Sequence, residues 1–300
     1  MVARRYYIDD RQKNEIAAEM GISRFKVARL IEDAKASGIV HITIKMPADV
    51  DLDLGEQLVK SFQIQRAIVA RNADHHPAAI RAVLGSAAAA YLSTAIGDED
   101  VMGISWGSTL TSTVDAIQTL APAQIVQLVG GVQAGAMEAS GVELVRRLAE
   151  KSRGRAFPLH APLLVRTREM AAELRNDPSL AETIGRFPRL TKALVGIGSW
   201  APPRSSLYQE FDPSDRTSLS IDGAIGDICT QVFDEHGEAL DSPVLTRAVG
   251  ISLDELRRIG EVIAVAGGPD KIQAIRAVLR SGVVNTLITD APTATALLAD

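Results

Sequence analysis

The sequence predicts an α/β protein whose main part is a doubly wound, mostly parallel sheet covered by helices on both faces. From residue 66 onward, short apolar runs of strand length alternate with longer segments of helical periodicity. Such alternation is typical of strand–helix–strand units, whose crossover helices cover the sheet. Two short helices joined by a glycine turn precede this part, and 300 residues suffice for two unequal domains.

The expected strands are short runs rich in branched apolar side chains, at 66–70, 101–105, 124–129, 193–197, 228–233, 262–266 and 286–289. The expected helices carry longer apolar stripes, at 77–96, 110–120, 142–151, 271–279 and 293–298. We expect a helix-turn-helix domain at 1–46, a linker at 47–54 and the α/β domain at 55–300.

Composition limits the class of protein. The single cysteine, Cys229, excludes an internal disulfide framework and a multi-cysteine zinc site. No run reaches the roughly 18 apolar residues of a membrane span, and the first ten residues lack a signal-peptide core. The five histidines show no metal-ligand spacing. We therefore expect a cytoplasmic protein without a membrane segment or a bound metal.

A small basic segment precedes a large acidic remainder. Residues 1–46 hold nine Lys and Arg against six Asp and Glu, which gives a net charge of +3. Since the whole chain carries −5, the remaining residues carry a net charge of −8. Apolar spacing predicts a helix over 14–20 that Gly21 ends, and Ser23 is a suitable N-cap for a second helix that ends at Gly38. Residues 39–45 alternate as one or two short strands do.

The second of these helices has the layout of a DNA-recognition helix. Its buried stripe is expected to comprise Val27, Leu30, Ile31 and Ala34, and the opposite face is cationic with one aromatic residue. In a helix-turn-helix, the second helix enters the major groove with its N-terminal residues on base edges. The candidate DNA contacts are therefore Ser23, Arg24, Phe25, Lys26 and Arg29.

These contacts have distinct expected roles. Arg29 suits guanine or phosphate, Phe25 could meet a thymine methyl group, and the amides behind Ser23 suit phosphate. A solvated amphipathic helix, with Phe25 packed on a neighbour, would carry the same pattern. The compact layout favours DNA binding. Because affinity for DNA comes largely from phosphate neutralisation, a charge of +3 implies weak binding by one copy and hence a homo-oligomer.

Residues 101–110 read as a strand, a glycine turn and the start of a helix. The amides of Gly107, Ser108 and Thr109, the two hydroxyls and the helix dipole together form a suitable cradle for an anion such as phosphate. The segment is neither a Walker loop nor a GxGxxG fingerprint, so a purely structural turn is the alternative.

Three more glycine turns follow predicted strands, at 128–131, 195–199 and 265–268. In open α/β sheets, ligands bind outside the carboxyl ends of the strands, so turns of this kind can converge on one crevice. Gly130, Gly131 and Gly198 are therefore candidate ligand contacts.

Two charged residues are candidates for the same crevice. Lys271 follows Pro269 at a predicted helix start, where the helix dipole disfavours a cation unless an anion is near. A phosphate partner would explain this lysine, as would free solvation. Asp227 could accept hydrogen bonds from sugar hydroxyls or could satisfy a turn. No paired acid and base points to a catalytic residue.

Several of these motifs, in this order, resemble the SorC/DeoR-type family of bacterial sugar-responsive transcription regulators, over essentially the whole chain. The motifs are EIAAEMGISR at 15–24, GIVHI at 38–42, GISWGSTL at 103–110, QLVGG at 127–131, ALVGIG at 193–198, GAIGD at 223–227, AGGPDK at 266–271 and LITD at 287–290.

The resemblance implies a winged-helix-like head and an effector domain similar in fold to sugar-phosphate isomerases and glucosamine-phosphate deaminases. It implies an effector, a sugar or polyol phosphate, that changes the hold on operator DNA, usually in a tetramer, and it implies no cofactor. On the matching positions, Gly107, Ser108 and Thr109 would hold the phosphate. Asp227 would face the sugar hydroxyls, and Lys271 would meet the charge of the ligand.

The leading hypothesis is therefore a ligand-gated regulator of a carbohydrate or polyol operon. An enzyme acting on sugar phosphates is the alternative, because the body resembles such enzymes in fold. Likeness of fold does not establish catalysis, and the basic head has no use in an enzyme of that kind.

Overall fold

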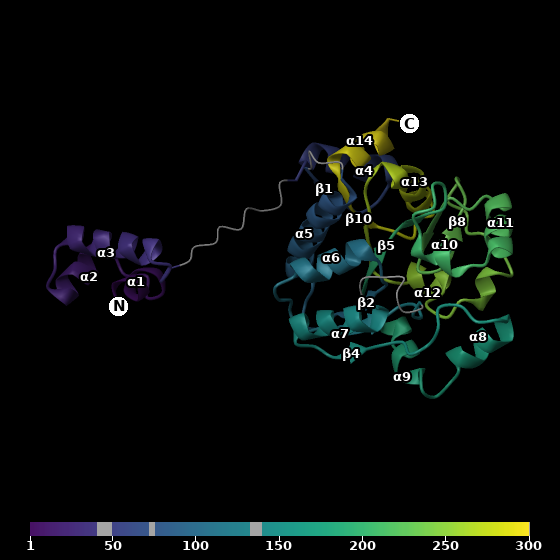
Figure 1. Cartoon of the computed structure of the whole chain (residues 1–300), viewed down its shortest axis with the longest axis horizontal. Helices are drawn as coiled ribbons and strands as arrows, with labels where there is room; N and C mark the ends of the chain where they lie inside the picture. The colour runs from purple at the N-terminus through teal and green to yellow at the C-terminus, as the bar shows by residue number, and fades with distance from the viewer. Residues whose placement is uncertain (41–49, 72–75, 133–139, 300) are drawn as a thin grey trace. The chain divides into compact units, whose positions relative to one another are not determined.

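The computed structural model describes residues 1–40, 50–71, 76–132 and 140–299. The chain divides into two compact units, Met1–Met46 and Pro47–Asp300. Figure 1 labels the helices of both units and several strands of the second.

The first unit contains the two predicted helices and one more. Its helices are α1 (Val2–Tyr7), α2 (Lys13–Met20) and α3 (Arg24–Ala36). Gly21 ends α2 with a left-handed φ of +63°, and the Ser23 hydroxyl caps α3 by accepting a hydrogen bond from the Lys26 amide at 3.2 Å. The unexpected α1 packs on α2 and α3 and contributes Val2 to their small core.

Two expectations for this unit need correction. Leu30 is 37% exposed, whereas Val27 and Ile31 are buried, because the small core covers only a narrow stripe of α3 and Leu30 lies at its edge. Ile39 and Val40 follow α3 in a bend rather than a strand, and the rest of the predicted strand, 41–45, lies outside the described residues.

The second unit is built on a sheet of seven parallel strands, in the order β1-β10-β9-β5-β2-β3-β4. The strands are β1 (Arg66–Ala70), β2 (Val101–Ile104), β3 (Gln124–Gln127), β4 (Ala156–Phe157), β5 (Lys192–Gly196), β9 (Glu261–Val265) and β10 (Thr286–Asp290). The order diverges between β2 and β5: β3 and β4 follow toward one edge, and β9 and β10 toward the other.

Helices cover both faces of this sheet, which confirms the predicted doubly wound architecture (Figure 1). One face packs on α5 (Pro77–Ala95), α6 (Ser108–Ala116) and α7 (Gly141–Ser152). The other packs on α4 (Leu52–Phe62), α13 (Ile272–Arg280) and α14 (Ala291–Leu298).

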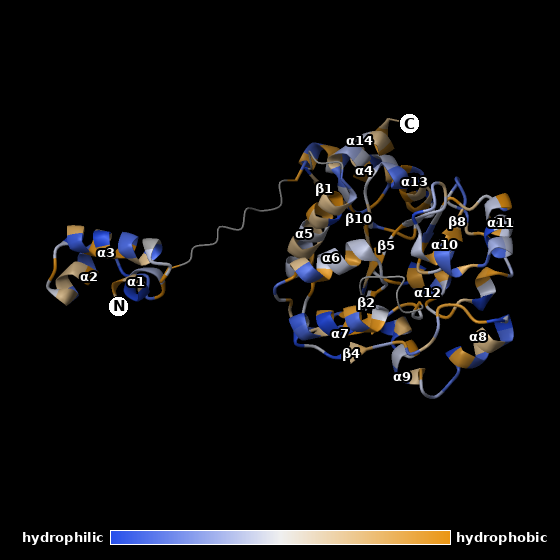
Figure 2. Ribbon diagram, viewed as in Figure 1, coloured by the Kyte–Doolittle hydropathy of each residue, from blue (hydrophilic) through white to orange (hydrophobic). Residues whose placement is uncertain are grey.

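Successive strand residues pack on opposite faces. In β5, Leu194 packs toward α5, α6 and α7, whereas Ala193 and Val195 pack on the other face. Both faces are thus buried, so the strands are almost continuously apolar. The helices instead carry apolar and polar side chains in alternation, as the blue and orange turns of α7 in Figure 2 illustrate. Its leucines at 144 and 148 are buried, and its Arg146 and Glu150 are exposed.

A second sheet and several short helices lie outside the main sheet. The sheet is antiparallel and contains β6 (Gly198–Ser199), β7 (Gly226–Ile228) and β8 (Gln231–Phe233). The short helices are α8 (Arg168–Arg175), α9 (Ala181–Ile184), α10 (Ser206–Glu210), α11 (Pro213–Ile221) and α12 (Leu253–Arg257), with 3₁₀ turns η1 (Phe187–Arg189), η2 (Leu245–Arg247) and η3 (Pro269–Lys271).

The predicted single strand at 228–233 is wrong, because the chain reverses there in a two-residue turn. Cys229 and Thr230 join β7 to β8 with φ of 46° and 69°. Positive φ at both central residues is what a tight type I′ hairpin turn requires, and Gly, Asn or Asp normally provide it. A cysteine and a branched threonine gave no signal of a turn.

The predicted linker at 47–54 is also wrong at its end. Val50 bridges to Ala70, and the Asp51 carboxylate caps α4 by accepting a hydrogen bond from the Leu54 amide at 3.1 Å. Residues 50–54 therefore belong to the second unit. Residues 47–49 lie outside the part that the structure describes.

Among the described residues, α5 is the one helix whose length and mean hydropathy would allow it to cross a membrane. Its buried side chains, Ile80, Leu84 and Leu92 among them, pack with α6 and the main sheet. The apolar side chains of α5 are thus part of the protein core, so the length and composition of this helix are weak evidence for a membrane span.

The turn between β7 and β8 yields a stability prediction. Replacing Thr230 with Gly should raise the free energy of unfolding by about 1 kcal/mol, because glycine adopts a positive φ without the clash of a β-carbon. Urea unfolding of Thr230→Gly and Thr230→Ala measures this. The alanine variant keeps the clash and should gain nothing, and equal stabilities of the two variants would contradict the assignment of strain.

Candidate functional site

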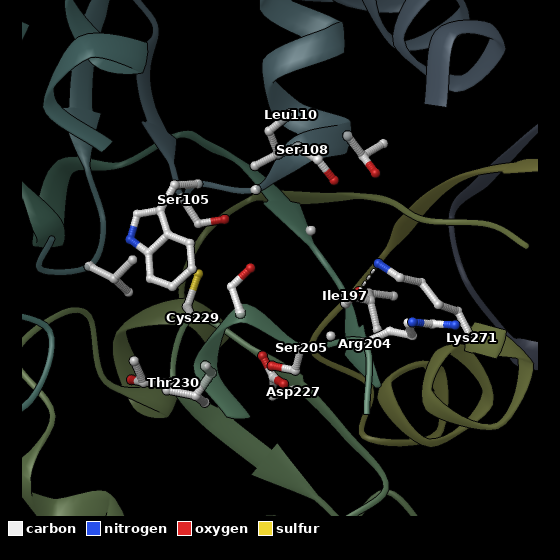
Figure 3. A pocket seen from close by; sticks show the side chains of 18 residues that line it. Ser105, Ser108, Leu110, Ile197, Arg204, Ser205, Asp227, Cys229, Thr230 and Lys271 are labelled. Carbon is white, nitrogen blue, oxygen red and sulfur yellow. Dashed lines mark hydrogen bonds between the residues drawn. The ribbon is translucent and has the colours of Figure 1, made fainter. Parts of the chain in front are cut away.

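A cavity opens at the carboxyl ends of β2 and β5, where the strand order diverges. In open α/β sheets this is the position at which ligands bind. Its walls come from the loops after β2, β3 and β5, the starts of α6 and α10, the turn between β7 and β8, and η3 (Figure 3). The lining residues are 105–110, Val129, 196–198, 204–207, Asp227, Cys229, Thr230 and Lys271.

One wall of the cavity is the N-terminus of α6. Gly107, at φ +146°, is the N-cap, so the helix starts at Ser108, two residues before the predicted start at 110. The hydroxyl-bearing Ser108 and Thr109 therefore lie in the first turn and line the cavity. The first amides of a helix have no partner within it, so this wall presents free hydrogen-bond donors and a positive dipole end.

Lysine and arginine side chains lie beside this helix N-terminus. Lys271 sits in η3, and its Nζ donates a hydrogen bond to the Ile197 carbonyl oxygen at 2.6 Å. A second cavity, which shares Ser108, Thr109, Arg204 and Lys271 with the first, adds Arg81 from α5. No hydrogen bond or ion pair joins Arg81 to any residue in the described ranges.

These cations lie close enough to affect one another. Burial lowers the pKa of the Lys271 ammonium, the nearby Arg81 lowers it further, and Asp227 acts in the opposite direction by raising it. An anion bound beside these cations would offset their mutual repulsion, because it attracts each of them. The wall therefore suits an anionic group.

The opposite charge in the cavity is the carboxylate of Asp227, only 7% exposed. Trp200 Nε1 donates to its Oδ1 at 2.9 Å, and the Ser205 hydroxyl also hydrogen-bonds to it. Burial raises the pKa of Asp227, whereas the bonds from Ser205 and Trp200 and the charge of Lys271 lower it. Figure 3 shows Asp227 and Ser205 close together.

Gly198 makes this arrangement possible. A β-carbon at this position would lie 2.3 Å from Asp227 Oδ1 and 2.5 Å from Ser205 Oγ. Gly198 lines the cavity, and only a residue without a side chain leaves room for the carboxylate and hydroxyl beside it.

Six predicted ligand contacts thus line one cavity: Gly107, Ser108, Thr109, Gly198, Asp227 and Lys271. Gly130 and Gly131 do not. Their amides donate to the carbonyl oxygens of Val249 and Ala161, and a β-carbon on Gly130 would lie 2.4 Å from the Pro162 carbonyl oxygen. Gly130 therefore allows two backbone segments to pack closely, and the preceding Val129 reaches the cavity instead.

Sequence reasoning missed several lining residues. Arg81 projects from a helix and Arg204 from an irregular loop, and neither position carries a local motif. The Cys229 thiol is buried and lines the cavity (Figure 3). Burial raises the pKa of its thiol to about 12, so the group is neutral at physiological pH and acts as a small, weakly polar surface.

The candidate DNA contacts lie on α3 of the first unit. Phe25 is 87% exposed, and Arg24, Lys26 and Arg29 are exposed without ion-pair partners within the described part of the chain. The Ser23 hydroxyl is engaged in the helix cap. The N-terminal half of α3 therefore presents unpaired cations around an exposed aromatic ring.

The described ranges contain no group of three or more His, Cys, Asp or Glu side chains that could hold a metal ion.

Comparisons with known proteins assign the chain to a family. A family model described as "Putative sugar-binding domain" matches residues 47–299. The transcriptional regulator YjhU of Escherichia coli K12 is 29% identical, over 98% of this chain and 92% of that protein. The deoxyribonucleoside regulator of Bacillus subtilis is 29% identical, over 99% and 96%.

Solved structures agree with this assignment. The full-length sorbitol operon regulator SorC of Klebsiella pneumoniae is 25% identical and superposes with a TM-score of 0.84, over 99% of this chain and 96% of that one. The chain belongs to the SorC/DeoR-type family of sugar-binding transcriptional regulators.

Proposed function

We propose that a phosphorylated sugar or polyol, bound in the cavity at the carboxyl ends of β2 and β5, controls the hold of this regulator on operator DNA. The proposal rests on one observation: a helix N-terminus with cations beside it and a buried carboxylate line the same cavity. A phosphate suits the first, and hydroxyl groups suit the second.

The phosphate would lie at the start of α6. The amides of Ser108 and Thr109, with their hydroxyls, donate hydrogen bonds toward this position, and the helix dipole favours negative charge there. Lys271 and Arg81 supply positive charge. Charge-assisted hydrogen bonds of this kind are about twice as strong as neutral ones.

The hydroxyl-bearing end of the ligand would face Asp227. An ionised carboxylate has about four acceptor positions, and Trp200 and Ser205 hydrogen-bond to it from the protein side. The remaining positions can accept hydrogen bonds from ligand hydroxyls. The neutral Cys229 thiol and Val129 bound the cavity with weakly polar and apolar surface.

DNA would be bound by α3, with Arg24, Phe25, Lys26 and Arg29 at the base edges and phosphates, and with the amides behind Ser23 on phosphate. Because the unit carries a charge of only +3, we propose that two or four copies act together on operator DNA. The protein would act in the cytoplasm, where its DNA target lies.

We propose binding without turnover and without a cofactor. The relatives are named as regulators, and Asp227 is the single carboxylate among the residues that line the first cavity. A ligand controls such a protein through a difference in affinity between its two arrangements.

The first prediction concerns the phosphate position. Ser108→Ala/Thr109→Ala should bind a phosphorylated sugar or polyol at least about tenfold more weakly, because each hydrogen bond to a charged group contributes about 1.5–3 kcal/mol. Thermal unfolding against a panel of sugars, polyols and their phosphates measures it, since a ligand that binds the native state raises the midpoint.

Ser93→Ala on α5, whose hydroxyl bonds to the Ala90 carbonyl oxygen, serves as the control and should bind as the wild type does. A shift with free polyols alone, and none with any phosphate, would show that α6 does not hold a phosphate. Turnover of a panel compound by the purified protein would favour an enzyme.

The second prediction concerns Asp227. Since the raised pKa means that the folded chain holds this proton more tightly than the unfolded chain, the free energy of unfolding should fall as pH rises from about 4 through the raised pKa. Asp227→Asn should remove this contribution, be more stable at neutral pH and bind the ligand more weakly. Urea unfolding across pH measures it; an unchanged pH profile would mean that Asp227 does not titrate as assigned.

The third prediction concerns α3. Arg29→Ala should weaken binding to the duplexes that the full-length chain enriches from a random pool, by about 1–3 kcal/mol if Arg29 contacts a guanine. Fluorescence anisotropy measures the affinity. Lys35→Ala, which removes an equal charge paired with Glu32 at the far end of α3, should have a smaller effect. Equal losses in both variants would point to general electrostatics instead.

A further inference from the structure

Arg204 stands between the two cavities at the carboxyl end of the sheet. It lines both of them, together with Ser108, Thr109 and Lys271. Figure 3 shows Arg204 on the side of the cavity occupied by Lys271, away from Cys229 and Thr230. Its guanidinium is thus within the group of cations that surrounds the proposed phosphate position.

In the structure this guanidinium is paired with a carboxylate. Arg204 Nε donates to Asp270 Oδ2 at 2.9 Å, and the two side chains are 62% and 48% exposed. Ion pairs with this degree of exposure are weak, because water and salt screen them. A phosphate dianion carries more charge than one carboxylate and offers more acceptor oxygens, so it is the stronger partner for a guanidinium.

The pair joins two segments that both carry other groups of the site. Arg204 immediately precedes Ser205, which bonds to Asp227 and caps α10. Asp270 immediately precedes Lys271 in η3. An exchange of partner by Arg204 would therefore act on both segments at once, and on the Asp227 end of the cavity as well as the phosphate end.

We propose that Arg204 exchanges partners: a ligand phosphate displaces Asp270 and takes over the guanidinium, so that Asp270 acts as a built-in competitor that sets the affinity for anions. This inference rests on the proposed function, since it requires an anion at the start of α6. It makes Arg204 a binding residue for the phosphate and Asp270 its opponent, so their removal has opposite effects.

The test is a double-mutant cycle on the full chain, with inorganic phosphate as the probe and apparent affinity taken from thermal unfolding. Asp270→Asn should bind phosphate about two- to fivefold more tightly, as expected on loss of an exposed ion pair. Arg204→Gln should bind about tenfold more weakly. In the Arg204→Gln background, Asp270→Asn should bring no gain, because there is no guanidinium left to release.

Glu56→Gln on α4 is the matched control, since it removes one negative charge from another exposed ion pair, with Lys60. It should leave the affinity unchanged. An equal gain from Asp270→Asn with and without Arg204 would overturn the exchange in favour of simple repulsion by Asp270. So would an Arg204→Gln variant that binds as the wild type does.

The outcomes also distinguish a failure of the partner exchange from a failure of the proposed phosphate binding at α6. Loss of phosphate binding in Ser108→Ala/Thr109→Ala, without any effect at Arg204 or Asp270, would overturn the exchange and leave the phosphate site intact. No response to phosphate in either the wild type or Asp270→Asn, with a response to an unphosphorylated polyol, would overturn both.

Discussion

The reversal of strand order between β2 and β5 is the constraint on which the site depends. At that point the loops after the two strands part, which leaves a cavity at the carboxyl edge of the sheet. The same divergence directs α6 to one face with its N-terminus at the cavity, and sends the chain after β5 into the small antiparallel sheet that carries Asp227. The packing of the sheet thereby places a helix dipole and a carboxylate opposite each other.

The buried charges at the carboxyl edge of the sheet lower the stability of the folded chain, because burial disfavours their ionised forms. Burial raises the pKa of Asp227 and lowers that of Lys271. The charge of Lys271 favours the ionised form of Asp227, and the charge of Asp227 favours the ionised form of Lys271. Cys229 and Thr230, at positive φ, add a backbone conformation that their side chains disfavour. Strain and buried charge of this kind collect at functional sites, and a ligand with a charged end and hydroxyl groups would offset part of it.

Local patterns predicted much of this architecture. Glycine turns after apolar runs located the cavity, and the loop at Gly107 and the positions of Asp227 and Lys271 were found from their neighbours in sequence. Arg81 and Arg204 could not be predicted, because α5 and the loop after β6 meet α6 only in the folded chain. The turn at Cys229 lacks the usual turn residues, and Asp51, which lies in the predicted linker, is a helix cap.

The affinity for operator DNA should be measured with and without a saturating amount of the phosphorylated compound that best stabilises the protein. We expect the ligand to change the affinity for DNA, and bound DNA to change the affinity for the ligand by the same factor, because coupling between two binding sites is reciprocal. Identical DNA affinities in the two conditions would contradict it, since a ligand that binds both arrangements equally shifts neither.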